Sequence, residues 1–322
     1  MKAIVQSGFG VATDVLSLED IEKPPVGPGS ILVQVRAVGV AKGNWLITRG
    51  LPYIARPAYG IRTPKHRVAG LQFAGTVAAL GENVDGFAIG DAVFGLHPGT
   101  LADFVSAPVD DVVLIPAGIS FEQAAAAPIS GLAALEAVRD AGRVGQGHRV
   151  LVIGASGGVG SFAVQIAKAF GAHVTGVAST RNLDSLRELG ADDVVDYTRD
   201  DPLAMRPGYD VIIDIAGNRP VSRLRRALAP EGTLAIVGGT GGRWTMGFGR
   251  TIGGVLLGKL VRQRIVAVLS MANSEDLGVL ADLMATGKLT PVVEPAGSLG
   301  RAAEVIERVG AGHGVGTLVL TP

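Results

Sequence analysis

A glycine cluster directly after an apolar strand pattern is the first feature of this chain that could do chemistry: residues 149–160 read RVLVIGASGGVG. Ala155, Gly157 and Gly160 occupy the three positions of a G-x-G-x-x-G pattern, with Ala in the first. Glycine lets the backbone approach a pyrophosphate, and the unpaired N–H groups of a helix N-terminus attract its charge. The pattern predicts a dinucleotide-binding turn made of Ala155, Ser156, Gly157, Gly158, Val159 and Gly160. A strand-to-helix turn that holds no ligand is the alternative.

The end of the next strand pattern bears on which dinucleotide would bind. Many such sites place an acid here to hold the adenosine ribose, whereas this chain has Ser179, Thr180 and Arg181. Hydroxyl and guanidinium groups can donate charge-assisted hydrogen bonds to a 2′-phosphate, each worth roughly 1.5–3 kcal/mol. We therefore expect NADP(H) rather than NAD(H). In the other interpretation, Arg181 is a solvated residue in the first turn of the next helix.

The elements around this turn alternate between short apolar runs and helical patterns. Runs such as HVTGVA and YDVIIDIAG are separated by stretches such as NLDSLRELG and PVSRLRRALAP. This spacing favours right-handed crossovers and a parallel sheet that is covered on both faces. The helical pattern opens near Ser120, and Gln123 three residues later completes a capping-box pattern. We predict that a new, doubly wound domain begins close to this point.

The N-terminal part of the chain has a different period. Strand patterns such as KAIVQ and ILVQVRAVGV are separated there by Gly, Pro and Asp, which predicts an all-β or barrel-like unit. The last part of the chain has one helix pattern, RAAEVIERVGAG, and one strand pattern, VGTLVLTP. Since no further unit follows them, we expect these elements to return to the first domain.

Composition excludes several classes of function. Lys and Arg total 29, Asp and Glu also total 29, and no long run of one sign occurs. We therefore expect no binding to nucleic acid or to membranes. The chain has no cysteine, so it has neither disulfides nor thiolate metal ligands. Its start, MKAIVQSGFGVATD, has no apolar core long enough for a signal peptide, and we expect a cytoplasmic protein.

Four segments carry a resemblance to a known family: FAGTVAALGENVDGFAIGDAVFG, FEQAAAAPISGLAALEA, VLVIGASGGVGSFAVQIAKAFGAHVTGVAST and LGADDVVDYT. Over nearly its whole length the chain resembles the medium-chain dehydrogenase/reductase superfamily, in its zinc-free branch of quinone oxidoreductases and zeta-crystallin. The resemblance implies an α/β fold, with a GroES-like β-rich domain formed by residues 1–118 and 291–322. It also implies a Rossmann doubly wound parallel-sheet domain of residues 119–290, with the active site for a small-molecule substrate in the cleft between them.

The same resemblance implies further residues near the nicotinamide. They are Ser130, Val237, Gly238, Gly239, Leu269 and Ser270. No metal is expected, because the zinc-dependent relatives carry Gly-His-Glu and cysteine ligands where this chain has Gly70-Leu71-Gln72 and no cysteine. The five histidines lack the spacing of a metal cluster.

On the substrate side the chain departs from its relatives. Ala41 and Asn44 stand where many of them have Asn and Asp, so a proton donor cannot be inherited directly. The candidate catalytic residues are Tyr53, Lys42 and Asn44, with Tyr53 first because a phenol can donate a proton and pack on an apolar substrate. Trp45, Tyr59 and Trp244 are candidate walls of the substrate pocket. In the alternative, Tyr53 and Tyr59 only pack beneath the loop that holds them.

Residues 238–264 form an irregular stretch in which Trp244 lies among glycines and precedes an apolar helix pattern, TIGGVLLGKLV. An exposed apolar helix without a partner would be costly, so we expect a contact of a homodimer here. Packing of this helix against its own domain is the other interpretation.

Three functions remain open. The first is NADPH-dependent, metal-free reduction of a quinone or an α,β-unsaturated carbonyl (enone or enoyl) substrate by hydride transfer. Such acceptors delocalise the charge that they take up, so they need little help from a Lewis acid. The second is a tailoring enzyme of secondary metabolism that keeps the fold and catalyses a non-reductive step such as cyclisation or dehydration. The third is a non-catalytic nucleotide-binding protein.

Overall fold

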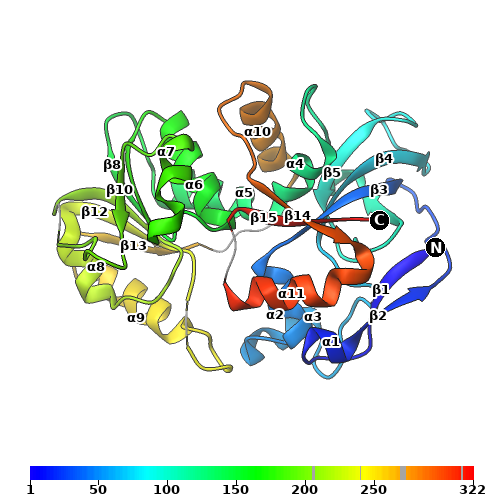
Figure 1. Ribbon diagram of the computed structural model, residues 1–322, viewed down its shortest axis with the longest axis horizontal. Helices are drawn as coiled ribbons and strands as arrows, with labels where there is room; N and C mark the ends of the chain where they lie inside the picture. The colour runs from blue at the N-terminus through cyan, green and yellow to red at the C-terminus, as the bar shows by residue number, and fades with distance from the viewer. Residues whose placement is uncertain (205–206, 240, 269–272, 313–314) are drawn as a thin grey trace. The chain divides into compact units, whose positions relative to one another are not determined.

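The computed structural model describes residues 1–204, 207–239, 241–268, 273–312 and 315–322. The chain forms two compact units, each with its own main sheet (Figure 1). The first unit contains Met1–Ser130 and Ala272–Pro322, and the second contains Gly131–Met271. Helix α5, Pro128–Leu135, contains the point at which the first unit passes into the second.

The first unit is built on a sheet whose strand order is β14-β15-β3-β4-β5-β7, with β6 paired to β3. A separate antiparallel pair is formed by β1 and β2. The strands are β1 Lys2–Gln6, β2 Leu16–Asp20, β3 Ser30–Val40, β4 Gln72–Leu80, β5 Ala92–Leu96, β6 Phe104–Pro108, β7 Val112–Leu114, β14 Val293–Ser298 and β15 Thr317–Thr321. β15 runs antiparallel to β3, with Leu318 opposite Val40, so the C-terminal strand lies in the same sheet as the N-terminal ones.

Alternation along these strands builds the core of the first unit. Ile31, Val33 and Val35 are buried on β3, since alternate residues of a strand point to the same face. They pack in one cluster with Phe73 of β4 and Leu320 of β15. The period-2 pattern read from the sequence is therefore the one that the sheet uses.

Helices cover the rest of the first unit. They are α1 Ala12–Val15, α2 Lys42–Arg49, η1 Tyr53–Ala55, α3 Arg56–Tyr59, η2 Val109–Asp111, α4 Phe121–Ala126, α10 Ser274–Ala285, η5 Leu299–Arg301 and α11 Ala302–Ala311. The capping box predicted at the start of α4 is present. The Gln123 amide N–H donates to Ser120 Oγ at 3.2 Å, and the Ser120 amide N–H donates to Gln123 Oε1 at 3.1 Å.

The second unit contains a parallel sheet of order β10-β9-β8-β11-β12-β13, which confirms the prediction from strand and helix alternation. Its strands are β8 Arg149–Ile153, β9 His173–Ala178, β10 Asp193–Asp196, β11 Tyr209–Asp214, β12 Leu228–Ile236 and β13 Arg264–Ala267. The chain builds outward from β8 to β10, and then returns to the other side of β8 to continue with β11. The carboxyl ends of β8 and β11 are therefore a topological switch point, where open α/β sheets bind ligands.

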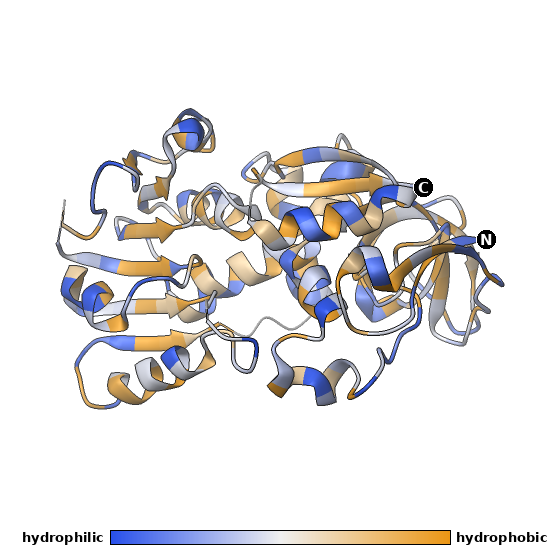
Figure 2. Ribbon diagram, turned by 60° about the horizontal axis from the view of Figure 1, so that its bottom comes forward, coloured by the Kyte–Doolittle hydropathy of each residue, from blue (hydrophilic) through white to orange (hydrophobic). Residues whose placement is uncertain are grey.

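The helices of the second unit pack against both halves of this parallel sheet. They are η3 Glu136–Ala141, α6 Gly158–Ala169, η4 Thr180–Asn182, α7 Leu183–Glu188, α8 Val221–Ala227 and α9 Phe248–Gly258. Among them α6 and α7 contact β9 and β10, whereas α8 and α9 contact β12 and β13. The strands are largely apolar in Figure 2, as expected for a sheet buried on both faces.

Candidate functional site

The glycine-rich turn connects β8 to α6. Gly154 has a φ of +88°, and the Ala155 amide N–H donates to the Val177 carbonyl oxygen of β9 at 3.0 Å. Gly157 is the N-cap residue of α6, which begins at Gly158 and includes Val159 in its first turn. A Cβ atom at Gly160 would lie 2.2 Å from the Gly154 carbonyl oxygen, so only glycine fits there. The turn therefore brings the helix N-terminus close against the end of β8.

A side chain that the sequence analysis did not single out holds this turn in place. Asn182 lies in η4, is buried, and donates from Nδ2 to Ser156 Oγ at 3.0 Å. η4 directly follows the end of β9, so the glycine-rich turn is joined to the predicted ribose-binding segment. The only feature of the sequence that could have pointed to Asn182 was its position next to Arg181.

The predicted 2′-phosphate residues lie at the end of β9, beside a buried carboxylate on the neighbouring strand. The Thr180 hydroxyl donates to Asp196, the last residue of β10. The other oxygen of Asp196 accepts hydrogen bonds from the Thr198 amide N–H at 2.9 Å and hydroxyl at 2.7 Å. The hydrogen bond from Thr180, followed by that from Thr198, holds the pKa of Asp196 below its usual value.

This carboxylate changes what the segment can offer to a ligand. Because the Thr180 hydroxyl proton is directed at Asp196, Thr180 turns only its oxygen lone pairs elsewhere. A phosphate dianion has no proton to give to those lone pairs. The donors left for a 2′-phosphate are the half-buried Ser179 and the exposed Arg181.

The next candidate cofactor residues follow β12. The amide N–H groups of Val237 and Gly238 both donate to the Asp214 carbonyl oxygen, at 3.0 and 3.2 Å. A Cβ atom at Gly238 would lie 1.9 Å from the Ile215 carbonyl oxygen, and one at Gly239 would lie 2.5 Å from that of Met246. Both positions therefore need glycine. The remaining candidates, Leu269 and Ser270, lie outside the described residues.

A buried ion pair at the end of β11 organises this region, and the sequence analysis missed it. Asp214 is fully buried, accepts from the Gly217 amide N–H at 3.1 Å, and pairs with Arg250 of α9. Arg250 Nε also donates to the Arg219 carbonyl oxygen at 2.8 Å. The pair thus fixes both the loop after β11 and the position of α9. The sequence does contain a sign of this pair, because an acid ends an otherwise apolar strand in VIIDIAG.

In the first unit, two candidate catalytic residues have structural contacts in α2. Asn44 is buried, and its Oδ1 accepts from the Ala41 amide N–H at 2.9 Å, which caps the helix. Lys42 Nζ donates to the Gly310 carbonyl oxygen of α11 at 2.6 Å and lies 4.3 Å from the Trp45 ring centroid. Burial lowers the pKa of the Lys42 ammonium group.

Trp45 also belongs to the contact between α2 and α11. A Cβ atom at Gly310 would lie 2.2 Å from Trp45 Nε1, so the indole packs directly on the glycine backbone. Next to it, Arg49 Nη2 and Glu307 Oε2 form an ion pair at 2.6 Å. The indole therefore has a packing role whether or not it also contacts a substrate.

The two tyrosines differ in their contacts. The Tyr59 hydroxyl donates to the Leu51 carbonyl oxygen, and its ring stands edge-on to Phe9 with 6.3 Å between centroids. Burial raises the pKa of the Tyr59 phenol, and the Arg56 charge acts in the opposite direction. Tyr53 is half-buried, with the Arg56 guanidinium carbon 4.6 Å from its ring centroid.

Ser130, a candidate residue near the nicotinamide, is buried in α5.

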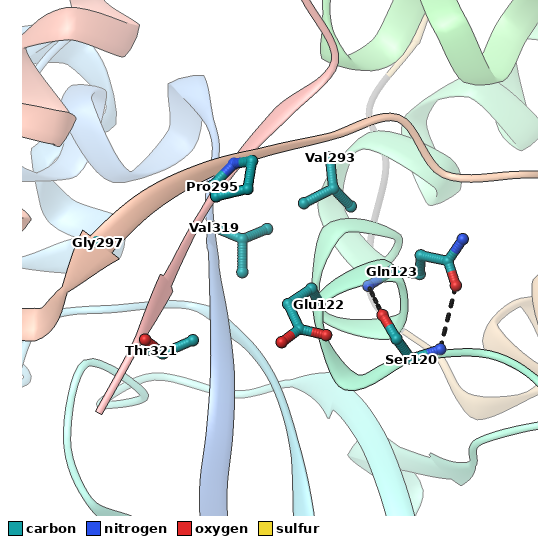
Figure 3. A pocket seen from close by; sticks show the side chains of 8 residues that line it. All are labelled: Ser120, Glu122, Gln123, Val293, Pro295, Gly297, Val319 and Thr321. Atoms are coloured by element: carbon teal, nitrogen blue, oxygen red, sulfur yellow. Dashed lines mark hydrogen bonds between the residues drawn. The ribbon is translucent and has the colours of Figure 1, made fainter.

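A cavity of about 410 Å³ lies in the first unit, between the start of α4 and strands β14 and β15 (Figure 3). Its lining residues are Ser120, Glu122, Gln123, Val293, Pro295, Gly297, Val319 and Thr321. Ser120 and Gln123 are already engaged with each other in the capping box. Every lining residue lies outside the sets predicted to bind cofactor or substrate.

Gln72, at the position of a zinc ligand in the zinc-dependent relatives, has a structural contact. It is fully buried, and its Oε1 accepts from the Ile129 amide N–H at 2.8 Å. Within the described ranges, no three His, Asp or Glu side chains are grouped so that they could hold a metal ion. In the same part of the chain, every helix is too short or too polar to cross a membrane.

Comparisons with known proteins cover both units. The family described as "Alcohol dehydrogenase GroES-like domain" matches residues 27–117, and the one described as "Zinc-binding dehydrogenase" matches residues 158–285. The structure of the quinone oxidoreductase from Coxiella burnetii superposes with a TM-score of 0.87 at 31% identity, covering 100% of this chain and 99% of that one. These matches confirm the expected α/β fold, a GroES-like domain with a Rossmann-like domain.

Two curated proteins extend the similarity over the full length. The "Quinone-oxidoreductase QR1, chloroplastic" of Triphysaria versicolor is 29% identical over 337 residues, covering 100% of this chain and 98% of its own length. The "2-methylene-furan-3-one reductase" of Solanum lycopersicum is 28% identical over 337 residues, covering 100% of this chain and 79% of its own. One of these names specifies a quinone, the other an α,β-unsaturated ketone.

Proposed function

Since the chain belongs to the medium-chain dehydrogenase/reductase superfamily, in its quinone oxidoreductase branch, we propose that it reduces a quinone or an enone by hydride transfer from NADPH. The protein is an oxidoreductase of the quinone and enoyl reductase type, in a family that uses NAD(P).

The glycine-rich turn is the observation that carries the proposal. Within the described residues no side chain caps the start of α6, so the N–H groups of its first turn are left for a ligand. A Cβ atom at Gly157 would meet a single atom within 4 Å, the Gly154 carbonyl oxygen at 3.7 Å, so this side of the turn is sparsely packed. These features fit a pyrophosphate. The bound nicotinamide supplies the hydride, and the second unit orients it.

The substrate side favours a quinone. When a quinone accepts a hydride, the resulting hydroquinone anion takes a proton on oxygen, and water can supply that proton. An enone also needs a proton on carbon, or a donor that holds the enolate oxygen. Of the three candidates, Tyr53 is the proposed donor, because a phenol can donate a proton and also pack on an apolar substrate.

The proposal is tested by calorimetric titration with NADPH and NADH, followed by NADPH consumption with quinones and enones in the presence of a chelator. Binding of NADPH with turnover supports a metal-free reductase. Failure to bind either nucleotide would overturn the proposal at its first step. Binding without turnover would instead favour the tailoring or the non-catalytic function.

Replacing Tyr53 by Phe should separate the two substrate classes. We expect enone turnover to fall about a hundredfold, as for loss of a general acid, while quinone turnover changes little. Tyr209→Phe is the matched control, because Tyr209 is buried in the core of the second unit, outside the predicted site residues, and should leave both rates unchanged. Equal rates for Tyr53→Phe and the parent enzyme on both substrates would give Tyr53 a packing role only.

Replacing Asp196 by Asn should strengthen NADPH binding about fivefold and leave NADH binding nearly unchanged. The reason is that the substitution removes a negative charge next to Thr180, which we place near the 2′-phosphate, and charges of like sign repel each other. Asp184→Asn, an exposed carboxylate on α7, is the control. If both nucleotides respond equally in titration, Asp196 does not face the 2′ position.

A further inference from the structure

Helix α9 and the turns on either side of it present a stripe of exposed apolar side chains. The stripe consists of Trp244, Phe248, Ile252, Leu256 and Leu260. Between 41% and 84% of the surface of each of these residues is exposed. Because they are spaced by four residues on a helix of 3.6 residues per turn, Phe248, Ile252 and Leu256 share one face, and Leu260 lies in the turn that follows α9.

The opposite face of α9 is firmly packed, so the outward direction of the stripe is fixed. A Cβ atom at Gly254 would lie 3.3 Å from Ile236, and one at Gly258 would lie 3.2 Å from Ile265. The buried pair between Arg250 and Asp214 anchors the same face. On the outer face, Cβ atoms at Gly249 and Gly253 would meet nothing within 4 Å. The apolar face is therefore built into the fold.

Basic residues occur at both ends of the stripe in the sequence. Residues 232–274 contain neither Asp nor Glu, and their basic residues are Arg243, Arg250, Lys259, Arg262 and Arg264. Of these, Arg243, Lys259 and Arg262 are exposed, and within the part of the chain that the structure describes none of the three has an ion-pair partner. Lys259 is the C-cap residue of α9. Helical spacing gives its side chain a direction around the helix axis between the directions of Phe248 and Ile252, which is the outer face. In a protein of zero net charge, this is a local concentration of one sign.

We propose that this face of α9 binds the surface of an anionic phospholipid bilayer. A helix that combines Trp, Phe and Leu on one side with Lys and Arg beside them lies in the interface, where the apolar groups enter the acyl boundary and the cations meet lipid phosphates. The expectation of no membrane binding rested on the balanced total charge, which does not describe the local charge beside α9.

Charge also decides against a second copy of this chain as the occupant. In a two-fold contact the same patch lies on both sides, so the unpaired cations Arg243, Lys259 and Arg262 of one copy would face a patch of the same sign. An anionic lipid surface instead supplies the opposite charge for every one of them. The charges beside α9 have no effect on a homodimer formed through another surface.

The test is co-sedimentation of the full chain with vesicles of phosphatidylcholine alone or with about 30% phosphatidylglycerol. We expect binding to the anionic vesicles only, weakened by added salt. Leu256→Asp should lower the bound fraction at least tenfold, and Lys259→Gln with Arg262→Gln, which removes two charges, about 25-fold, at about fivefold per charge. Ile89→Asp is the matched control, an apolar residue of the first unit that is more exposed than Leu256, and should bind as the parent does.

Three results would overturn the proposal. They are failure of the folded parent protein to bind anionic vesicles, equal binding to both kinds of vesicle, and equal losses for Leu256→Asp and Ile89→Asp. Sedimentation velocity adds a fourth: a dimer that Leu256→Asp converts to monomers, without any vesicle binding, assigns the face to a second copy. Thermal unfolding checks each variant, and Ile252→Asp replaces Leu256→Asp if the latter does not fold.

Discussion

Replacing Arg250 by Met should lower the free energy of unfolding by about 3–5 kcal/mol, because it leaves the fully buried Asp214 without its cation. The loss should appear in urea unfolding as a lower midpoint. The loop after β11 and the seating of α9 both depend on this pair, so the damage is expected to include nucleotide binding.

Two further variants make this prediction specific. Adding Asp214→Asn to Arg250→Met should recover part of the stability, since the unpaired buried charge is then removed. Arg223→Met breaks an exposed pair with Asp201 and should cost less than about 1 kcal/mol. If Arg250→Met costs no more than Arg223→Met, the buried pair does not have the stabilising role assigned to it.

Replacing Arg181 by Ala should weaken NADPH binding about 10- to 100-fold and change NADH binding little. Arg181 is the exposed cation of the predicted ribose-binding segment, and a guanidinium–phosphate hydrogen bond contributes roughly 1.5–3 kcal/mol. Calorimetric titration with both nucleotides measures the effect, and added salt should narrow the difference between them.

Arg187→Ala is the matched control for this prediction. Arg187 lies one helix further on and already pairs with the exposed Asp184, so its loss should affect neither nucleotide. Equal losses of NADPH and NADH binding in Arg181→Ala would show that the side chain does not distinguish the 2′-phosphate. The proposed preference for NADPH would then have no support in this segment.

The sequence by itself determined the features that depend on local backbone chemistry. The strand-to-helix turn follows from the missing Cβ atoms, and Gly160 lies where the structure leaves no room for one. The capping box needs only Ser120 and Gln123, three residues apart. Strand and helix periods likewise depend on neighbouring residues, which is why the parallel sheet could be predicted.

Only the tertiary structure decided which distant groups meet. Asp196 reaches Thr180 because β10 pairs with β9, and Asp214 reaches Arg250 because α9 returns to the sheet beside β12 and β13. It also decided which face of α9 is turned outward. Exposed apolar side chains and cations therefore occur together there, although the net charge of the chain is zero. Strand order and helix docking minimise the free energy of the whole packed unit, and no single stretch of sequence contains that information.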